Sequence, residues 1–323
     1  MAISRAQILK ELTPGLHAIF GSEYGRYEDE HAVLFDSETS KRAFEEEVLF
    51  PGFEEAQIKG EGASISYAEA GEGFIARYSH NTIALAFSIT EEAMEDNLYD
   101  KLSTRLTKSL ARAMASTKQT TASNVYNNAF SSSFTGGDGV SLLNASHPTS
   151  SGTVQSNVLS SNSDLSETSL EQSLIDISGF KDDKGVPAAI QAKTLHIPKE
   201  LVFTAERLMA SPYRTSTADN DINAIKNSGM IPGGYYVNHR FTDTDAFFIR
   251  TDAPDGMKMF TRTPISTSME GDFETGNVDT KREKDIASAI LTGVVFSELQ
   301  ASKFIIGGAN VSYYFATLPL QTI

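Results

Sequence analysis

The sequence predicts an α+β fold organised around one long helix, and three patterns lead to this prediction. Short runs of alternating apolar and polar residues, punctuated by glycines, indicate strands over residues 48–89. A helical pattern then continues without a break over residues 90–117. Residues 166–275 mix short helical and strand patterns. The 323 residues are enough for one large domain or two modest ones.

Composition and charge exclude several classes of protein. The chain has 42 acidic and 27 basic residues, a net charge of −15, whereas specific nucleic-acid readers carry a basic face. It has no cysteine, which excludes disulfides, thiolate metal sites and cysteine nucleophiles. No apolar run reaches about 18 residues and the start lacks the apolar run of a signal peptide, so neither membrane span nor leader is expected.

The N-terminal segment, residues 1–47, has too few apolar residues to form a core of its own. An apolar helical stripe, interrupted by Pro14 and Gly15, is expected at Ile8, Leu12, Leu16 and Ile19. A second short helix is expected over residues 36–48, with Glu45, Glu46 and Glu47 on a solvated face. The segment is therefore predicted to lie on another surface.

Residues 48–89 are predicted to form a hairpin and a further strand. Ile65 and Tyr67 share one strand face, Phe74 to Tyr78 form the next strand, and residues 70–73 supply the turn because glycine accepts positive φ. Alternation from Ile83 to Ile89 then predicts a separate strand.

The long helix is predicted over residues 90–117, with acidic residues first and basic residues later, as the helix dipole prefers. Its apolar stripe repeats every four residues and should wrap around the helix, because the helix repeats every 3.6 residues. The stripe consists of Met94, Leu98, Leu102, Leu106, Leu110 and Met114. Residues 118–165, rich in Ser, Thr, Asn and Gly, are predicted to be loops.

The remaining elements are short. They are a helix over 166–179, strands over 194–197, 235–241, 246–251 and 257–262, a helix from 198 to 211, and a final strand over 311–315. The turn over residues 252–256 predicts that the strands on either side of it pair with each other.

No catalytic, cofactor-binding or metal-binding residue is predicted, so the sequence favours a structural protein over an enzyme. The histidines are His17, His31, His80, His147, His196 and His239, and no two lie within five residues. The Gly-rich run at 136–139 lacks the Lys-Ser/Thr of a phosphate loop, and no G-x-S-x-G occurs. A hydrolase whose site is invisible in the sequence remains an alternative.

The order of these elements, together with several short stretches, resembles the major capsid proteins of tailed bacteriophages with the Hong Kong 97-like fold. Those stretches are residues 143–148, with small residues before His-Pro; 194–198 leading into 205–209; 256–260; and 272–276. The resemblance implies an N-terminal arm at 1–47, an extended E-loop at 48–89, a peripheral domain at 90–139 with a spine helix at about 90–117, an axial domain at 140–275, and a C-terminal part of the peripheral domain at 276–323.

The resemblance also implies a function. Copies of the chain would assemble into hexamers and pentamers of an icosahedral shell enclosing phage double-stranded DNA, with the E-loop on one neighbour and the arm on another. Portal, scaffolding and decoration proteins are implied partners. DNA would be met only by non-specific proximity, and no membrane would be. The implied location is the virion capsid, assembled in the host bacterial cytoplasm.

Two alternatives share parts of this pattern, namely an encapsulin-type compartment shell and another virion structural protein, such as a decoration or tail component. Some relatives of the resembled family crosslink subunits through a lysine and an asparagine. Lys59 is the one lysine in the predicted E-loop and so the one candidate, but the partner Asn and catalytic Glu cannot be placed and no crosslink is predicted.

Overall fold

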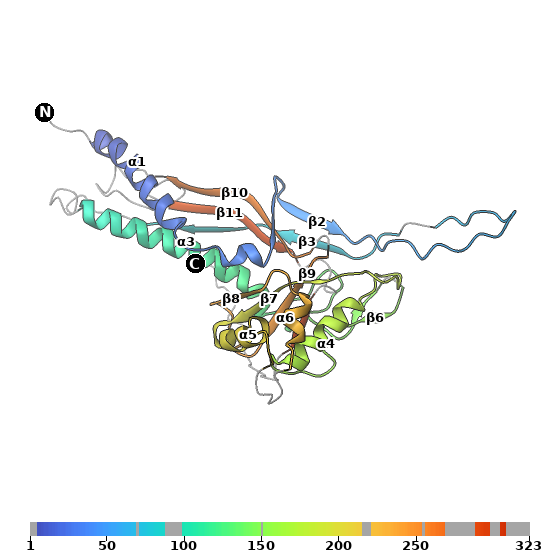
Figure 1. Cartoon of the computed structure of the whole chain (residues 1–323). Coiled ribbons are helices and arrows are strands. Elements are labelled where there is room, and N and C mark those ends of the chain that lie inside the picture. Colours follow the sequence, from blue (N-terminus) through green and yellow to red (C-terminus); the bar gives the residue numbers. More distant parts are fainter. Residues whose placement is uncertain are drawn as a thin grey trace.

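The computed structural model describes residues 5–68, 71–87, 99–149, 151–214, 221–253, 256–268, 288–297 and 304–307. Two four-stranded sheets organise the described chain, and a long hairpin projects away from the body (Figure 1). Two helical elements precede the first strand, α1 (Arg5–Tyr24) and the short 3₁₀ helix η1 (Glu30–Val33). Helix α1 packs beside the long helix α3 (Tyr99–Asn127).

The first sheet joins segments from both ends of the chain. Its strands, in spatial order, are β1 (Asp36–Thr39), β10 (Lys258–Ser268), β11 (Ser288–Ser297) and β4 (Asn81–Leu85). Strand β1 is parallel to β10, and the other two pairings are antiparallel. Helix α3 packs along β4 and β11, so sheet and helix form two layers.

The second sheet and the shorter helices lie in the same part of the molecule (Figure 1). Its strands, in spatial order, are β12 (Phe304–Gly307), β9 (Phe247–Thr251), β7 (Ala192–Pro198) and β8 (Tyr235–Asn238). The helices that accompany it are α4 (Glu167–Ser178), η2 (Lys199–Leu201), α5 (Val202–Met209) and α6 (Ala224–Ser228). Helix α4 begins at Ser166, whose side chain accepts a hydrogen bond from the amide of Ser169 in a capping box.

Two small ladders complete the structure. Strands β2 (Phe44–Val48) and β3 (Ile75–Ser79) pair antiparallel at the base of the hairpin, and residues 49–74 extend from them. Strands β5 (His147–Pro148) and β6 (Val154–Gln155) form a short antiparallel ladder, and in the sequence they come between α3 and α4.

Strand β9 lies between two hydrophobic cores and supplies side chains to both. Phe248 packs in the first core, edge-on to Tyr126 of α3 with ring centroids 5.1 Å apart. Phe247 and Ile249 point the other way and pack in the second core, which α4 and α5 cover. Because successive strand residues face opposite sides, five consecutive buried residues require covered faces on both sides.

The helix predicted over residues 36–48 is wrong, because this segment forms β1 and β2. Glutamate has good helix propensity, but strand pairing with β10 and β3 outweighs the few tenths of a kcal/mol per residue that propensity supplies.

The interruption predicted at Pro14 and Gly15 is also wrong, since α1 continues through both residues. Packing on α3 stabilises this helix, because Leu16 and Phe20 are buried. Residues 16–39 therefore contact their own chain, and a contact of the arm with a neighbouring copy stays a prediction.

Helix α3 ends at Asn127 rather than at 117, and the loop predicted for residues 118–127 is wrong. The predicted start, residue 90, lies outside the described residues. Leu110 and Met114 are buried as predicted, whereas Leu102 is 40% exposed. This confirms that the stripe wraps around the helix. From Met114 back to Leu102 there are three four-residue steps, which together rotate the side-chain position by about 120° away from the buried face.

Two predicted pairings are wrong. Residues 65–67 are not a strand, and β3 pairs instead with β2. Strand β10 pairs with β1 and β11 rather than with β9, because residues 252–256 carry the chain from one sheet to the other. The final strand predicted over residues 311–315 lies outside the described residues. The helices and strands predicted over residues 166–251 are confirmed, with shifted ends.

Buried His196 predicts a loss of stability in acid. Burial, helped by Arg250, lowers the pKa of His196 to about 3. The unfolded chain therefore binds this proton first, and stability present above pH ~6.5 is lost as the pH falls towards 3. Urea unfolding of unassembled protein at pH 7, 5.5 and 4 should give a falling free energy of unfolding. His196→Gln should flatten that fall, and equal slopes for both proteins would contradict the assignment.

Candidate assembly interface

The hairpin exposes large apolar side chains along its whole length. Those with the greatest exposed fractions are Phe50 at 71%, Phe53 at 59%, Ile58 at 102%, Ile65 at 69% and Tyr67 at 94%. Soluble monomers rarely gather exposed apolar groups in this way, and such gatherings mark surfaces that bind another molecule. Lys59, the candidate for a crosslink, is exposed on the same hairpin.

On the outward face of the hairpin base, the Arg77 side chain links the two strands. The guanidinium of Arg77 on β3 donates to Glu46 on β2, with 2.5 Å between nitrogen and oxygen. The same guanidinium lies 4.3 Å from the centre of the Phe44 ring. Cross-strand ion pairs and cation–π contacts each contribute a fraction of a kcal/mol on an exposed surface.

The inward face fixes the base to the first sheet. The amine of Lys258 on β10 lies 3.0 Å from a carboxylate oxygen of Glu47 and 3.3 Å from one of Glu38. The hydroxyl of Ser40 donates to Glu45 and lies 3.1 Å from Nε2 of His80. The prediction that the three glutamates form one solvated face is therefore wrong for Glu45 and Glu47. In a strand their side chains point opposite to Glu46.

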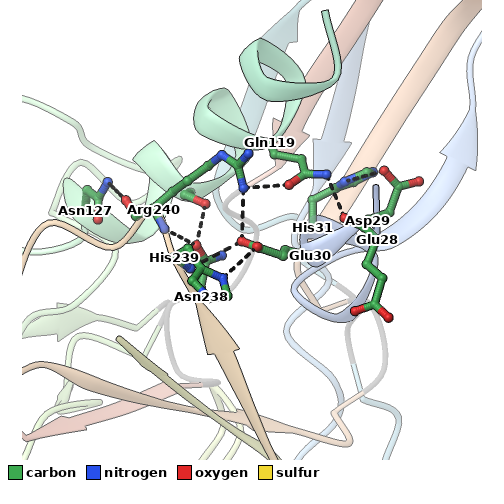
Figure 2. Close-up of polar contacts among 10 residues, drawn as sticks. Glu28, Asp29, Glu30, His31, Gln119, Asn127, Asn238, His239 and Arg240 are labelled. Carbon is green, nitrogen blue, oxygen red and sulfur yellow. Dashed lines mark hydrogen bonds and ion pairs between the residues drawn. The ribbon is translucent and has the colours of Figure 1, made fainter. Parts of the chain in front are cut away.

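A polar joint connects α3 with η1 and with the β8–β9 connection (Figure 2). Arg240 donates to a carboxylate oxygen of Glu30 at 3.1 Å and to the side-chain oxygen of Gln119 at 2.6 Å. The other carboxylate oxygen of Glu30 lies 2.9 Å from Nδ1 of His239. Gln119 in turn donates to the carbonyl of Glu28 at 2.8 Å. Elements far apart in sequence are thus held by one cation and one anion.

The last turns of α3 present a polar stripe to this joint. Ser123 donates to the side-chain oxygen of Asn238 at 3.2 Å, and Asn127 donates to the carbonyl of Arg240 at 3.1 Å. Gln119, Ser123 and Asn127 recur at four-residue spacing, which continues one face of the helix. The four-residue spacing could have indicated that the helix continues to residue 127. Ser, Thr, Asn and Gln side chains are typical of loops, however, so residues 118–127 are predicted as a loop from the sequence.

A buried histidine flanks the joint. His31 lies in η1, and its Nδ1 is 3.6 Å from Asp29 (Figure 2). Burial, and to a smaller extent the nearby Lys118 amine, lower the pKa of His31 to about 4, while the Asp29 carboxylate acts in the opposite direction. At neutral pH the ring is therefore uncharged and packs as part of the interior.

Arg250 on β9 anchors the start of the first sheet from inside. Its guanidinium lies 2.5 Å from the carboxylate of Asp36 and donates to the carbonyl of Val33 at 3.0 Å. A buried charge with these partners is costly to disrupt.

The histidines do not converge on a site. His17 contacts Thr267, His147 lies 2.6 Å from Asp138, and His196 lies 2.8 Å from the hydroxyl of Thr194. Among the described residues, no group of three or more His, Asp or Glu side chains is placed to hold a metal ion. None of the described helices combines the length and apolarity needed to cross a membrane.

A shallow groove of about 420 Å³ lies between α5, α6 and the glycine-rich turn before β8. Its apolar lining includes Met209, Ile225, Ile231 and Tyr235. Lys226 is its one charged lining residue, and the amine donates to the carbonyl of Ala210. Its other titratable lining residues are Tyr235 and Tyr236, and the hydroxyl of Tyr235 donates to a carboxylate oxygen of Glu206 at 2.7 Å.

The model of the family described as "Phage capsid protein" matches residues 75–295. The chain belongs to the phage capsid protein family. It is a major capsid protein, and copies of it associate into the shell of a virion capsid. The alternative of a separate compartment shell has less support, because the matching family is that of phages.

Solved structures resemble this capsid protein in fold at low sequence identity. The capsid of an empty GTA particle is 12% identical, with a TM-score of 0.50 over 88% of this chain and 90% of that chain. A capsid of the Myoviridae phage XM1 is 11% identical, with a TM-score of 0.48 over 85% and 89%. A virus-like particle from Pyrococcus furiosus is 8% identical, with a TM-score of 0.49 over 92% and 99%.

A comparison with curated proteins found no match. The α+β, Hong Kong 97-like fold predicted from the sequence is confirmed.

The polar joint should contribute measurably to stability. Glu30→Ala removes the anion that Arg240 and His239 share, and a half-buried charged hydrogen bond of this kind contributes roughly 1.5–3 kcal/mol. Urea unfolding of the unassembled capsid protein should show a loss of that order. Glu200→Ala is the matched control, because its pair with Lys199 is exposed and should contribute under about 1 kcal/mol. Equal losses in the two variants would contradict a special role for the joint.

Proposed function

We propose that this capsid protein builds an icosahedral shell of hexamers and pentamers around phage double-stranded DNA by laying the hairpin of each copy over a neighbouring copy. The observation that carries this proposal is the row of exposed apolar side chains from Phe50 to Tyr67. Residues 50–68 bury almost nothing on their own chain except Pro51, so the stabilisation that they can offer is available only to another molecule.

The geometry of the hairpin base supports the same proposal. Five residue pairs join β2 to β3, and Lys258 ties the ladder to the first sheet. A segment held in this way before it binds loses less conformational entropy on binding than a free loop would. Strands β2 and β3 form a two-stranded sheet in the described part of the chain, and a strand of a neighbouring copy could add to an edge of this sheet.

We propose the following division of the chain, which keeps the boundaries expected from the sequence with one change. Residues 1–47 are the arm, 48–89 the E-loop, and 90–139 with 276–323 the peripheral domain. The axial domain begins near residue 140 and is built on the second sheet. Because β10 pairs with β1 and β11, residues 258–268 belong with the peripheral sheet in this proposal.

The partners follow from the same role. Portal, scaffolding and decoration proteins are the proposed heterologous partners, and assembly is proposed to take place in the host bacterial cytoplasm. The net charge of −15 keeps contact with packaged DNA non-specific, since like charges repel. We also propose that the protein is not an enzyme and holds no cofactor. The scattered histidines and the apolar groove support that view.

The hairpin side chains should be required for assembly but not for folding. Phe53→Ser, Ile58→Ser and Tyr67→Ser combined should leave the thermal unfolding midpoint of the unassembled protein nearly unchanged, because exposed positions contribute within about 0.5 kcal/mol each. Closed shells, counted by negative-stain electron microscopy after size-exclusion chromatography, should disappear.

Ile175→Ser is the matched control, because Ile175 on α4 is 60% exposed but lies outside the hairpin. This variant should assemble as the parent protein does. A triple hairpin variant that forms normal shells would refute the proposed role.

A further inference from the structure

We infer that three short loops beneath the hairpin form a bracket that sets the direction in which the hairpin points, and with it the curvature of the shell. The bracket consists of residues 135–141, the β5–β6 ladder (His147–Pro148 with Val154–Gln155), and residues 180–187. The inference rests on the proposed function, because a direction matters to assembly only if the hairpin reaches a neighbouring copy.

The first end of the bracket presses on β3. A Cβ atom added to Gly137 would lie 3.0 Å from the Cβ of Ala76 and 3.3 Å from its Cα. Ala76 is buried on β3, so the loop backbone lies directly against one arm of the hairpin. The lack of a side chain at residue 137 is what permits this approach.

The second end lies next to the other arm of the hairpin, at the distance where a side chain at residue 52 would make an ordinary van der Waals contact. A Cβ atom added to Gly52 would lie 3.4 Å from a carboxylate oxygen of Asp182. Asp182 sits in a tight loop whose backbone it stabilises, since its other oxygen accepts from the amides of Lys184 and Val186, both at 2.9 Å. Gly52 follows β2, so the bracket meets both arms of the hairpin.

The two ends are connected through the β5–β6 ladder. Asp138 accepts from the amide of Val140 at 3.2 Å and lies 2.6 Å from Nδ1 of His147, the first residue of β5. Across the ladder, Gln155 donates to the carbonyl of Asp182 at 2.9 Å. A continuous set of polar contacts therefore runs from one end of the bracket to the other.

The bracket is part of the body rather than of the hairpin. Phe180, where the third loop begins, is buried in the second core, and Leu142, just after the first loop, is buried in the first core. The hairpin is thus supported at its base by groups that both cores hold in place. Residue 62 lies about 14 residues from Ala76, or roughly 45 Å along an extended chain, so a tilt of about 5° at the base moves the tip by about 4 Å.

The hairpin direction can be measured without assembly. The chain has no cysteine, so spin labels at Gly60→Cys on the hairpin and Lys199→Cys on the body can be placed specifically. Pulsed electron paramagnetic resonance on unassembled protein should give one narrow distance distribution. Gly137→Ala should shift its maximum by about 4 Å. Asp138→Asn, which weakens the contact with His147, should broaden it.

Matched variants separate the bracket from a general effect of substitution. Gly71→Ala makes the same change on the hairpin itself, where an added Cβ meets nothing within 4 Å, and should leave the distribution unchanged. Adding Ala76→Gly to Gly137→Ala removes the closest contact and should move the maximum back towards the parent value.

Assembly is the second readout. Gly137→Ala and Asp138→Asn should still form particles, but with altered or mixed diameters in electron micrographs. Unchanged distances and unchanged diameters in both folded variants would overturn the inference, and Asp138→Asn alone decides it if Gly137→Ala does not fold. Failure of the proposed function is a different result, because shells would then form without the hairpin apolar groups whatever the measured distances.

Discussion

The structure depends on the double burial of β9. Its alternating side chains fill two cores, so the strand that belongs to the second sheet also forms a wall of the first core through Phe248 and Tyr126. Arg250, two residues further on, holds the start of β1. One short strand thus fixes the helix, the second sheet and the N-terminal segment relative to one another. The polar joint at Arg240 adds a directional contact beside it. Packing supplies most of the free energy here, whereas the joint fixes the geometry.

A rigid body of this kind suits a protein whose hairpin works outside its own fold. In the proposed function, the hairpin gains stabilisation from its apolar side chains only when another copy covers them, so its position must be correct before that contact forms. The contacts of Lys258, Arg77 and the loops beneath β3 all act on the base of the hairpin. The contacts at the base therefore fix the direction of the hairpin, while its apolar side chains remain exposed.

The sequence predicted well where a single element carried its own pattern. The apolar residues Leu170, Leu174 and Ile177 sufficed to place α4, and a short strand pattern over residues 194–197 sufficed to place β7. The sequence predicted poorly where contacts with distant parts of the chain determine the secondary structure. Residues 36–48 have helix propensity, but they form strands because β1 pairs with β10 and β2 pairs with β3. Residues 118–127 look like a loop because their polar side chains serve the joint.

The same difference explains the candidate interface. The glycine spacing predicts a hairpin within residues 48–89, but not that its base is formed by β2 and β3. The contact between Asp138 and His147, and that between Arg240 and Glu30, could not be found in this way. Each joins residues whose separation in the chain carries no periodic signal, and only the packed fold brings them together.

The strand order of the first sheet has a consequence for how the chain folds. In the described part of the chain, β1 pairs with β10 and β4 pairs with β11, so each of these pairings joins segments more than 200 residues apart. The first sheet therefore closes only after the residues of β11, which ends at Ser297, have been synthesised. The base of the hairpin, which Lys258 ties to that sheet, becomes firm at the same moment. A nascent chain that lacks β10 and β11 therefore lacks the contacts that hold the base of the hairpin on the first sheet.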